Sequence, residues 1–276
     1  MGFQFKRIIS KAYLEWRDKN MRDLVTIAKV ELKKLLSRKD TWLMFTILLV
    51  PILYSVGLAF ESNVITYMGS GSVTAIGFTS AMFQMSQSMF IFNVILSAII
   101  GRSFASEIES KSLRLCINRI GDRRLIYFGK ELALLLYSAF IDVLLIATSI
   151  ICYYAVLTRN PNVANGVFCD NRMGTEIAQI LSVSIFWFIT IFIVMLMATK
   201  LKTLVCVATY MIFYIIMNLL SFLNGIKYFS PLYYLVEISS GSSSTLLDVT
   251  LFILYLFCIG IFFTYIGVHR LEKMDL

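Results

Sequence analysis

The chain has 276 residues, of which 58% are hydrophobic and only 15% are charged, and its formal net charge is +8. Soluble domains carry about 25% charged residues, and a globule of this size could not hide so much apolar surface from water. The composition therefore excludes a disordered chain, a fibrous repeat and a nucleic-acid-binding domain, and it argues against a soluble enzyme. An integral membrane protein is the class that remains.

Six apolar stretches are each long enough to cross a hydrocarbon core of about 30 Å as a helix. Helices are expected because they satisfy their backbone hydrogen bonds within one segment, as lipid requires. The sequence predicts an all-α integral membrane protein with six transmembrane helices, at about residues 42–60, 78–100, 132–157, 177–199, 203–223 and 249–268. Residues 63–77 are rich in Gly, Ser and Thr and are predicted to be loop. Residues 224–245 are predicted to form a short helix that dips back into the outer leaflet, with a flexible loop as the alternative.

Basic residues fall mostly on one side of these spans. Of the 25 Lys and Arg, 11 lie in residues 1–41 and 7 in residues 101–131, with four more at Lys200, Lys202, Arg270 and Lys273. The other side holds Arg159, Arg172 and Lys227. Because cytoplasmic segments carry the excess of Lys and Arg, we expect both termini in the cytoplasm and the chain in the cytoplasmic (inner) membrane of the cell.

Residues 1–40 are predicted to form a cytoplasmic or interfacial helical segment, followed by a six-span domain over 41–276. Apolar residues recur there at near-helical spacing between basic ones, which is typical of an amphipathic helix lying on a membrane. They are Phe3, Phe5, Ile8, Ile9, Leu24, Ile27, Ala28 and Leu35. A basic tail that only sets the topology is the alternative.

Sequence motifs for nucleotide binding and metal binding are absent. The Gly129-Lys130 pair is followed by Glu131, and no G-x-x-x-x-G-K-[ST] phosphate loop exists around it. The single histidine, His269, has no metal-ligand neighbours in sequence. We therefore expect no cofactor and no metal in this chain.

The loop over residues 102–130, between the second and third predicted spans, carries mixed charge around a helical pattern. Ser106 is positioned to cap a helix, with Glu107 and Glu109 in a first turn where the helix dipole favours acids. Gly121-Asp122 is a turn signal before the third span. A compact helix of this kind on the inner face is a plausible docking surface for a soluble partner, although ordinary solvated charges would give the same pattern.

The residues of this loop resemble those of the membrane subunits of type-2 ABC transporters, a family of permeases that work mainly as exporters. The resemblance is carried by Phe104, Glu107, Leu113, Leu115, Arg119, Arg123 and Lys130, by Ser230-Pro231 before Tyr233 and Tyr234, and by the ending from His269-Arg270 to Asp275-Leu276. The family has a proline before the arginine-rich turn. Asn118-Arg119-Ile120-Gly121 stands here instead, which leaves the end of the loop helix undefined.

The resemblance implies a permease that is not itself an enzyme. Two permease subunits, identical or different, would pair in the membrane lipid, and separate ABC ATPase subunits would bind ATP and Mg²⁺ beneath them. The loop helix would be a cytoplasmic coupling helix, with Glu107, Glu109, Arg114 and Arg119 in the ATPase-docking surface. The cargo would be a peptide, as in antimicrobial peptide export, or a drug-like or other amphipathic molecule.

Three polar residues lie within predicted spans. Asp142 would sit about 16 Å beyond Glu131 at 1.5 Å per residue, and an acid near mid-bilayer is a functional candidate by default. Asn93 and Asn218 are amides of the kind that bridge helices. A structural, hydrogen-bonded Asp142 is the alternative. Two other functions remain open: an ATPase-independent secondary transporter or channel, and a non-transporting immunity or anchor protein.

Overall fold

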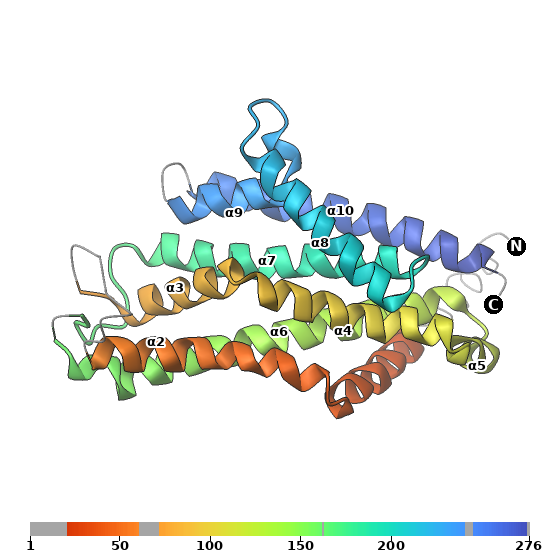
Figure 1. The fold of residues 1–276 in the computed structure, drawn as a ribbon, viewed down its shortest axis with the longest axis horizontal. Helices are drawn as coiled ribbons and strands as arrows, with labels where there is room; N and C mark the ends of the chain where they lie inside the picture. Colours follow the sequence, from red (N-terminus) through yellow and green to blue (C-terminus); the bar gives the residue numbers. More distant parts are fainter. Residues whose placement is uncertain (1–20, 61–71, 162, 241–244, 275–276) are drawn as a thin grey trace, which may run out of the picture.

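The computed structural model describes residues 21–60, 72–161, 163–240 and 245–274, and these residues are overwhelmingly helical (Figure 1). A helix over residues 21–37 comes first in the described part. The elements that follow are η1 (Thr41–Leu48), α2 (Leu49–Ala59), α3 (Ala75–Ser88), α4 (Phe90–Glu109), α5 (Ser112–Ile120), α6 (Arg123–Ala155), η2 (Leu157–Arg159), α7 (Met173–Ala198), α8 (Thr203–Ser221), η3 (Lys227–Phe229), α9 (Pro231–Ser240) and α10 (Thr245–Lys273). Within the described ranges, the β pairing consists of one isolated bridge between Val73 and Ala164.

Six of the described helical stretches are long and apolar enough to cross a membrane. They are Thr41–Ala59, Phe90–Glu109, Arg123–Arg159, Met173–Ala198, Thr203–Ser221 and Val249–Lys273. Each predicted span overlaps one of them, so the six-helix, multi-pass architecture is confirmed. The part of the amphipathic segment that precedes residue 21 lies outside the described residues, as do Asp275 and Leu276.

The second span differs from its predicted position at 78–100. The helical run begins earlier, at Ala75, and breaks at Met89, whose backbone is extended (φ −75°, ψ 97°). The span that meets the length and apolarity of a membrane helix is α4, which continues to Glu109. A count of uncharged residues could not find this break, because α3 and α4 are equally free of charge up to Arg102.

The segment over 224–245 contains the predicted short helix, since α9 occupies Pro231–Ser240. Of the predicted loop over 63–77, residues 61–71 lie outside the described part, and Thr74 caps α3 by accepting a hydrogen bond from the Gly77 amide at 3.0 Å. The preceding Val73 amide donates to the Val163 carbonyl at 2.7 Å. The Val73 contact joins the start of α3 to the connection between α6 and α7.

Helix α7 forms the centre of the bundle, because it packs against α3, α4, α6, α8, α9 and α10. Its buried face carries large apolar side chains, including Phe186, Trp187 and Ile191. Among the six candidate spans, α4 and α7 are the most buried and α8 is the least. The outer helices therefore present wide apolar faces, as expected for surfaces that meet lipid or another membrane protein.

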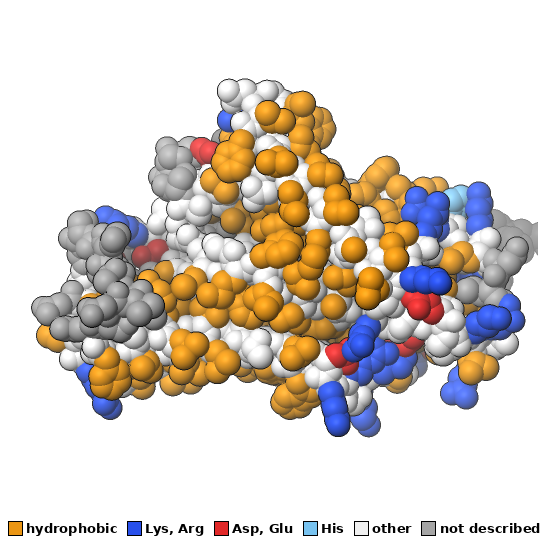
Figure 2. Space-filling model, in the orientation of Figure 1, with side chains coloured by type: hydrophobic (Ala, Val, Ile, Leu, Met, Phe, Trp, Pro, Cys, Tyr) orange, Lys and Arg blue, Asp and Glu red, His pale blue; other side chains and the backbone are white. Residues whose placement is uncertain are grey.

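Lys and Arg side chains gather at one end of the bundle, where α4 meets α5 and where α10 ends (Figure 2). We call this the basic end. The middle of the visible flank is covered by hydrophobic side chains instead. This distribution matches the division of charge read from the sequence.

Candidate functional site

Four charged side chains from three helices meet inside the basic end. Lys130 Nζ of α6 lies 2.7 Å from Glu107 Oε2 of α4 and 2.8 Å from Glu31 Oε2 of the helix over residues 21–37. Lys34 Nζ lies 2.5 Å from Glu107 Oε1 and 3.2 Å from Glu31 Oε1. We call Glu31, Lys34, Glu107 and Lys130 the ion cluster; Arg38 reaches its edge at 3.7 Å from Glu107.

The ion cluster is buried on the side of α6. The Lys130 side chain is 1% exposed, and both carboxylates are nearly as inaccessible. Burial disfavours the charged form of Lys34, but hydrogen bonding to Glu107 and the charges of Glu107 and Glu31 outweigh it, so the pKa of Lys34 is raised. Each buried charge has opposite-charge partners, which is the condition under which buried ions are tolerated.

Close packing allows helix 21–37 to reach α6. A Cβ placed on Gly129 would lie 2.5 Å from Ile27 Cγ2, a distance that atoms do not adopt without movement. Ala28 and Leu35 are buried on the same side of this helix. The glycine next to Lys130 therefore lets the two helices come close enough for the ion cluster to form.

Helix α5 sits at the tip of the basic end, between α4 and α6 (Figure 1). It starts after Lys111, which has a left-handed backbone (φ 58°), and it ends at Gly121 (φ 78°), whose amide donates to the Ile117 carbonyl at 2.8 Å. Glycine suits this left-handed position after a helix because it has no Cβ. The structure thereby defines the helix end that the missing proline left undefined.

The two faces of α5 differ sharply. Leu113 is fully buried against the bundle, whereas Leu115 is 72% exposed. Arg114 and Arg119 are also exposed, on the outward side. The buried Leu113 therefore packs α5 against the bundle, and a mixed basic and apolar surface of α5 points away from it.

The predicted capping role of Ser106 is wrong. Glu107 and Glu109 lie in the last turn of α4, not in the first turn of a new helix, and the Ser106 hydroxyl donates to the Arg102 carbonyl within α4. Buried Ile100 and Phe104 extend the apolar face of α4 past Gly101. This packing keeps the chain helical where the charges suggested a loop.

The predicted loop over 102–130 is also shorter than expected, because α6 begins at Arg123, with the Asp122 carboxylate accepting from the Arg124 amide at 2.8 Å. Arg123 reaches the end of α10, where it donates to the carbonyls of Leu271, Glu272 and Met274 at 2.9, 2.9 and 2.7 Å. An arginine satisfies the free carbonyls at a helix C-terminus in this way. The third span therefore starts nine residues before its predicted position and is tied to the last helix.

Glu109 links the end of α4 to the start of α8. Its Oε1 accepts hydrogen bonds from the Thr203 amide at 2.6 Å and from the Thr203 hydroxyl at 3.1 Å. An acid at this place satisfies one of the free amides at a helix N-terminus and complements the helix dipole.

Replacing Glu109 by alanine is expected to destabilise the chain by about 1 kcal/mol, since the loss of an N-terminal cap costs that much. The Glu109→Gln variant keeps an acceptor oxygen and should retain most of the stability. Thermal unfolding in one detergent compares the two. Equal midpoints for the alanine variant and the unchanged chain would show that Glu109 does not cap α8.

The four predicted docking residues thus divide into two groups. Glu109, Arg114 and Arg119 are exposed at the basic end, while Glu107 is buried in the ion cluster. Sequence reasoning missed Glu31, Lys34 and Lys130 as members of a site. Lys130 lies about two turns inside the long helix α6, and a charge at that depth could have signalled an internal partner.

The intramembrane polar residues are not brought together. Asn93 is buried and donates to the Gln87 carbonyl at 3.4 Å, across the break between α3 and α4. Asp142 is buried on α6 facing Ser184 of α7. Asn218 is exposed on α8. Among the described residues, Asp142 Oδ1 has no hydrogen-bond partner and no ion pair includes Asp142.

The Asp142→Asn variant is expected to be as stable as the unchanged chain or up to about 1 kcal/mol more stable, because it removes a buried acid that lacks a basic partner. Thermal unfolding and the yield of folded protein measure this. A clear loss of stability would show that the ionised carboxylate is itself a structural acceptor.

Within the part of the chain that the structure describes, no group of three His, Cys, Asp or Glu side chains could hold a metal ion. Comparison with known proteins does not assign the chain to a family: no protein-family model matches it, and no curated protein matches it significantly.

Proposed function

We propose that this chain is the membrane-spanning permease subunit of an ATP-driven exporter, and that α5 is the cytoplasmic coupling helix on which a separate ABC ATPase subunit docks. The observation that carries this proposal is the outward face of α5, where Leu115 is 72% exposed between Arg114 and Arg119. An exposed apolar side chain between two arginines, outside the candidate membrane spans, suits a protein–protein contact, where arginine is enriched and the centre is apolar. The resemblance to type-2 ABC permeases supplies the identity of the partner.

The connections of α5 provide a route from the ATPase to the membrane. Leu113 packs α5 against the bundle. Just before α5, Glu109 at the end of α4 binds the start of α8, and Glu107 binds Lys130 of α6 and Lys34 of helix 21–37. Movement of α5 would displace these elements together, because packed helices shift as bodies between discrete arrangements. In this account Glu107 positions the coupling helix and does not touch the ATPase.

The helix over residues 21–37 has the character of an interfacial helix in this proposal. Its buried side includes Ala28 and Leu35, while Lys29, Val30 and Lys33 are exposed. Exposed apolar and basic side chains on one helix suit the boundary between lipid tails and anionic headgroups. The proposal accordingly has the basic end on the cytoplasmic side of the membrane, as the excess of Lys and Arg there favours.

A second permease subunit is proposed to pack on α8, the least buried of the six candidate spans. The exposed side of α8 carries Ile212, Ile215 and Leu219, together with Asn218. An amide gains a hydrogen-bond partner at a helix–helix contact that lipid tails cannot offer. The cargo class proposed is a peptide, a drug-like molecule or another amphipathic molecule.

A secondary transporter or channel is the second candidate, and the buried Asp142 is the observation that favours it. Transporters of that kind usually place several ionisable residues and broken helices around one site. Asp142 and the break at Met89 lie on different helices, and the described contacts do not join them. A non-transporting immunity or anchor protein would use α5 to hold a partner without any transport.

Purification from native membranes in a mild detergent tests the proposed function, with copurifying proteins identified by mass spectrometry. We expect a stoichiometric ATPase that carries a phosphate loop. A chain with Leu115→Asp and Arg119→Glu should lose it, whereas Asp170→Asn, on the connection at the other end of the bundle, should keep it. Purification of the folded chain without any ATPase, even after crosslinking, would contradict the proposal.

A further inference from the structure

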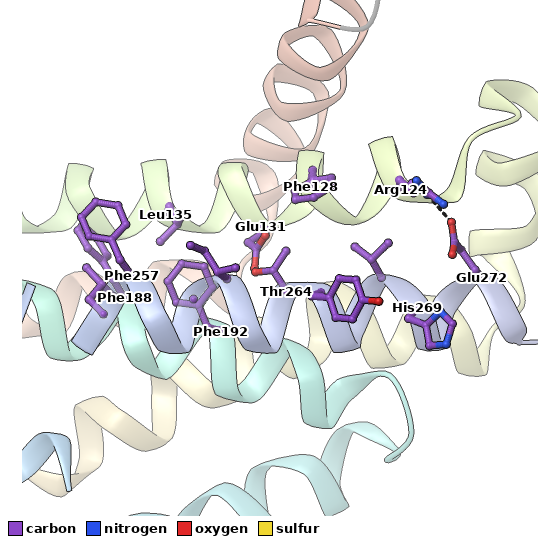
Figure 3. Close-up of a pocket in the computed structure, with 15 residues that line it drawn as sticks. Arg124, Phe128, Glu131, Leu135, Phe188, Phe192, Phe257, Thr264, His269 and Glu272 are labelled. Atoms are coloured by element: carbon purple, nitrogen blue, oxygen red, sulfur yellow. Dashed lines mark hydrogen bonds and ion pairs between the residues drawn. The ribbon is translucent and has the colours of Figure 1, made fainter. Parts of the chain in front are cut away.

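A groove with a volume of about 750 Å³ lies between α6 and α10, with α7 forming its floor (Figure 3). Pockets that hold small organic molecules are about 300–1,000 Å³. Phe257, Ile261 and Tyr265 of α10 line it and remain largely exposed, so it opens on the flank of the bundle. It is therefore accessible from the membrane side of the chain.

Five of the 15 residues that line the groove are Phe or Tyr, and they come from all three helices. Phe128 comes from α6, Phe188 and Phe192 from α7, and Phe257 and Tyr265 from α10. Figure 3 shows Phe188, Phe192 and Phe257 gathered at the end of the groove that lies away from Arg124. Such a wall binds apolar bodies by burial and attracts cations through the faces of its rings.

One carboxylate stands in the middle of this apolar wall. Glu131 Oε1 accepts a hydrogen bond from the Thr264 hydroxyl at 2.7 Å, and no ion pair in the described part of the chain includes Glu131. Its sequence neighbour Lys130 points to another face of α6, into the ion cluster. At 1.5 Å per residue, Glu131 lies about 10 Å along α6 from Arg124.

The other charges of the groove cancel. Arg124 and Glu272 form an ion pair at its outer end (Figure 3), and His269 stacks on Tyr265 with the two rings 6.3 Å apart. A ligand that enters the groove therefore meets Glu131 as an acid that has no basic partner among the described residues. An anion would be repelled there, and a neutral lipid tail would leave the carboxylate unpaired at a cost.

We propose that this groove is a binding site for lipophilic organic cations. Glu131 would be the counter-ion for the charge, and the aromatic side chains would contact the apolar part of the ligand. A cation with its charge among aromatic or alkyl groups matches both features at once. It also offers Glu131 a positively charged partner, which the described residues do not. The proposal concerns binding by this chain alone, and it stands whether or not an ATPase docks on α5.

Equilibrium dialysis of tetraphenylphosphonium against the purified chain in nanodiscs of uncharged lipid tests the proposal, with empty nanodiscs subtracted. Tetraphenylborate, which has the same shape and the opposite charge, is the matched probe. We expect saturable binding of the cation and none of the anion. Glu131→Gln should weaken cation binding at least about tenfold, whereas the loss of an exposed acid in Asp170→Asn should leave it unchanged.

A second pair of variants keeps the test valid if Glu131→Gln does not fold. Phe257 and Phe262 are 61% and 59% exposed on α10, and only Phe257 lines the groove. Phe257→Ala should weaken binding several-fold and Phe262→Ala should not. Equal binding of the two probes, or unchanged cation binding in both Glu131→Gln and Phe257→Ala, would overturn the proposal and leave a lipid-filled groove.

Discussion

Replacing Lys130 by methionine is expected to lower the free energy of unfolding by about 3 kcal/mol or more, the largest stability effect we expect from one substitution. The change leaves Glu31 and Glu107 buried with only Lys34 and Arg38, which are both more exposed than Lys130 and approach from one side. Breaking a buried ion group by removing one partner typically costs about 3–5 kcal/mol, because the remaining charge stays buried.

Thermal and denaturant unfolding in one detergent measure this effect. Lys200→Met removes an exposed lysine in the connection between α7 and α8, so it is the matched control and should be neutral. Adding Glu31→Gln to Lys130→Met should restore part of the loss, because it removes one of the two carboxylates left behind. A Lys130→Met chain with unchanged stability would mean that the ion cluster does not hold the three helices together.

Replacing Gly267 by alanine is expected to be the second most disruptive change, although it adds one methyl group. A Cβ on Gly267 would lie 2.2 Å from the Tyr127 hydroxyl oxygen and 2.5 Å from Tyr127 Cζ. Tyr127 is fully buried and packs edge-on against Phe104, with the ring centroids 5.6 Å apart. The ring has no free space to enter, so overpacking should cost about 1–3 kcal/mol.

The control for this change is Gly174→Ala in the first turn of α7, where an added Cβ would meet nothing within 4 Å. That variant should be as stable as the unchanged chain or slightly more stable, because alanine favours helix over glycine. The shift in the unfolding midpoint compares the two variants. Equal midpoints would contradict the close approach of α6 and α10 near Gly267.

The number and order of the membrane helices could be predicted from the sequence, because hydropathy and the position of charges determine them directly. The break at Met89 could not, since it changes neither charge nor apolarity. The break lies beside a tertiary contact, in which the Trp187 indole of α7 donates to Gln87 Oε1 at 2.8 Å. Such a contact joins residues that are far apart in the sequence, so no local sequence pattern predicts it.

The basic end was predicted less well than the spans. The resemblance implied that Glu107 belongs to the ATPase-docking surface, but its described partners are Lys34 and Lys130 within the chain. The exposed positions of Arg114 and Arg119 follow from the helical spacing around Leu113 and were easier to predict. The groove beside Glu131 was not predicted, because it needs α6, α7 and α10 to be placed together.

Crosslinking from the tip of α5 tests the central proposal most directly. A photoreactive amino acid in place of Leu115, which is 72% exposed, should capture an ATPase subunit with a phosphate loop when native membranes are irradiated. The same group in place of Val143, which is exposed on the apolar flank of α6, should not capture it. Capture of the ATPase at Leu115 alone is the result we predict. No ATPase adduct at Leu115, with the chain folded and in the membrane, would contradict the account.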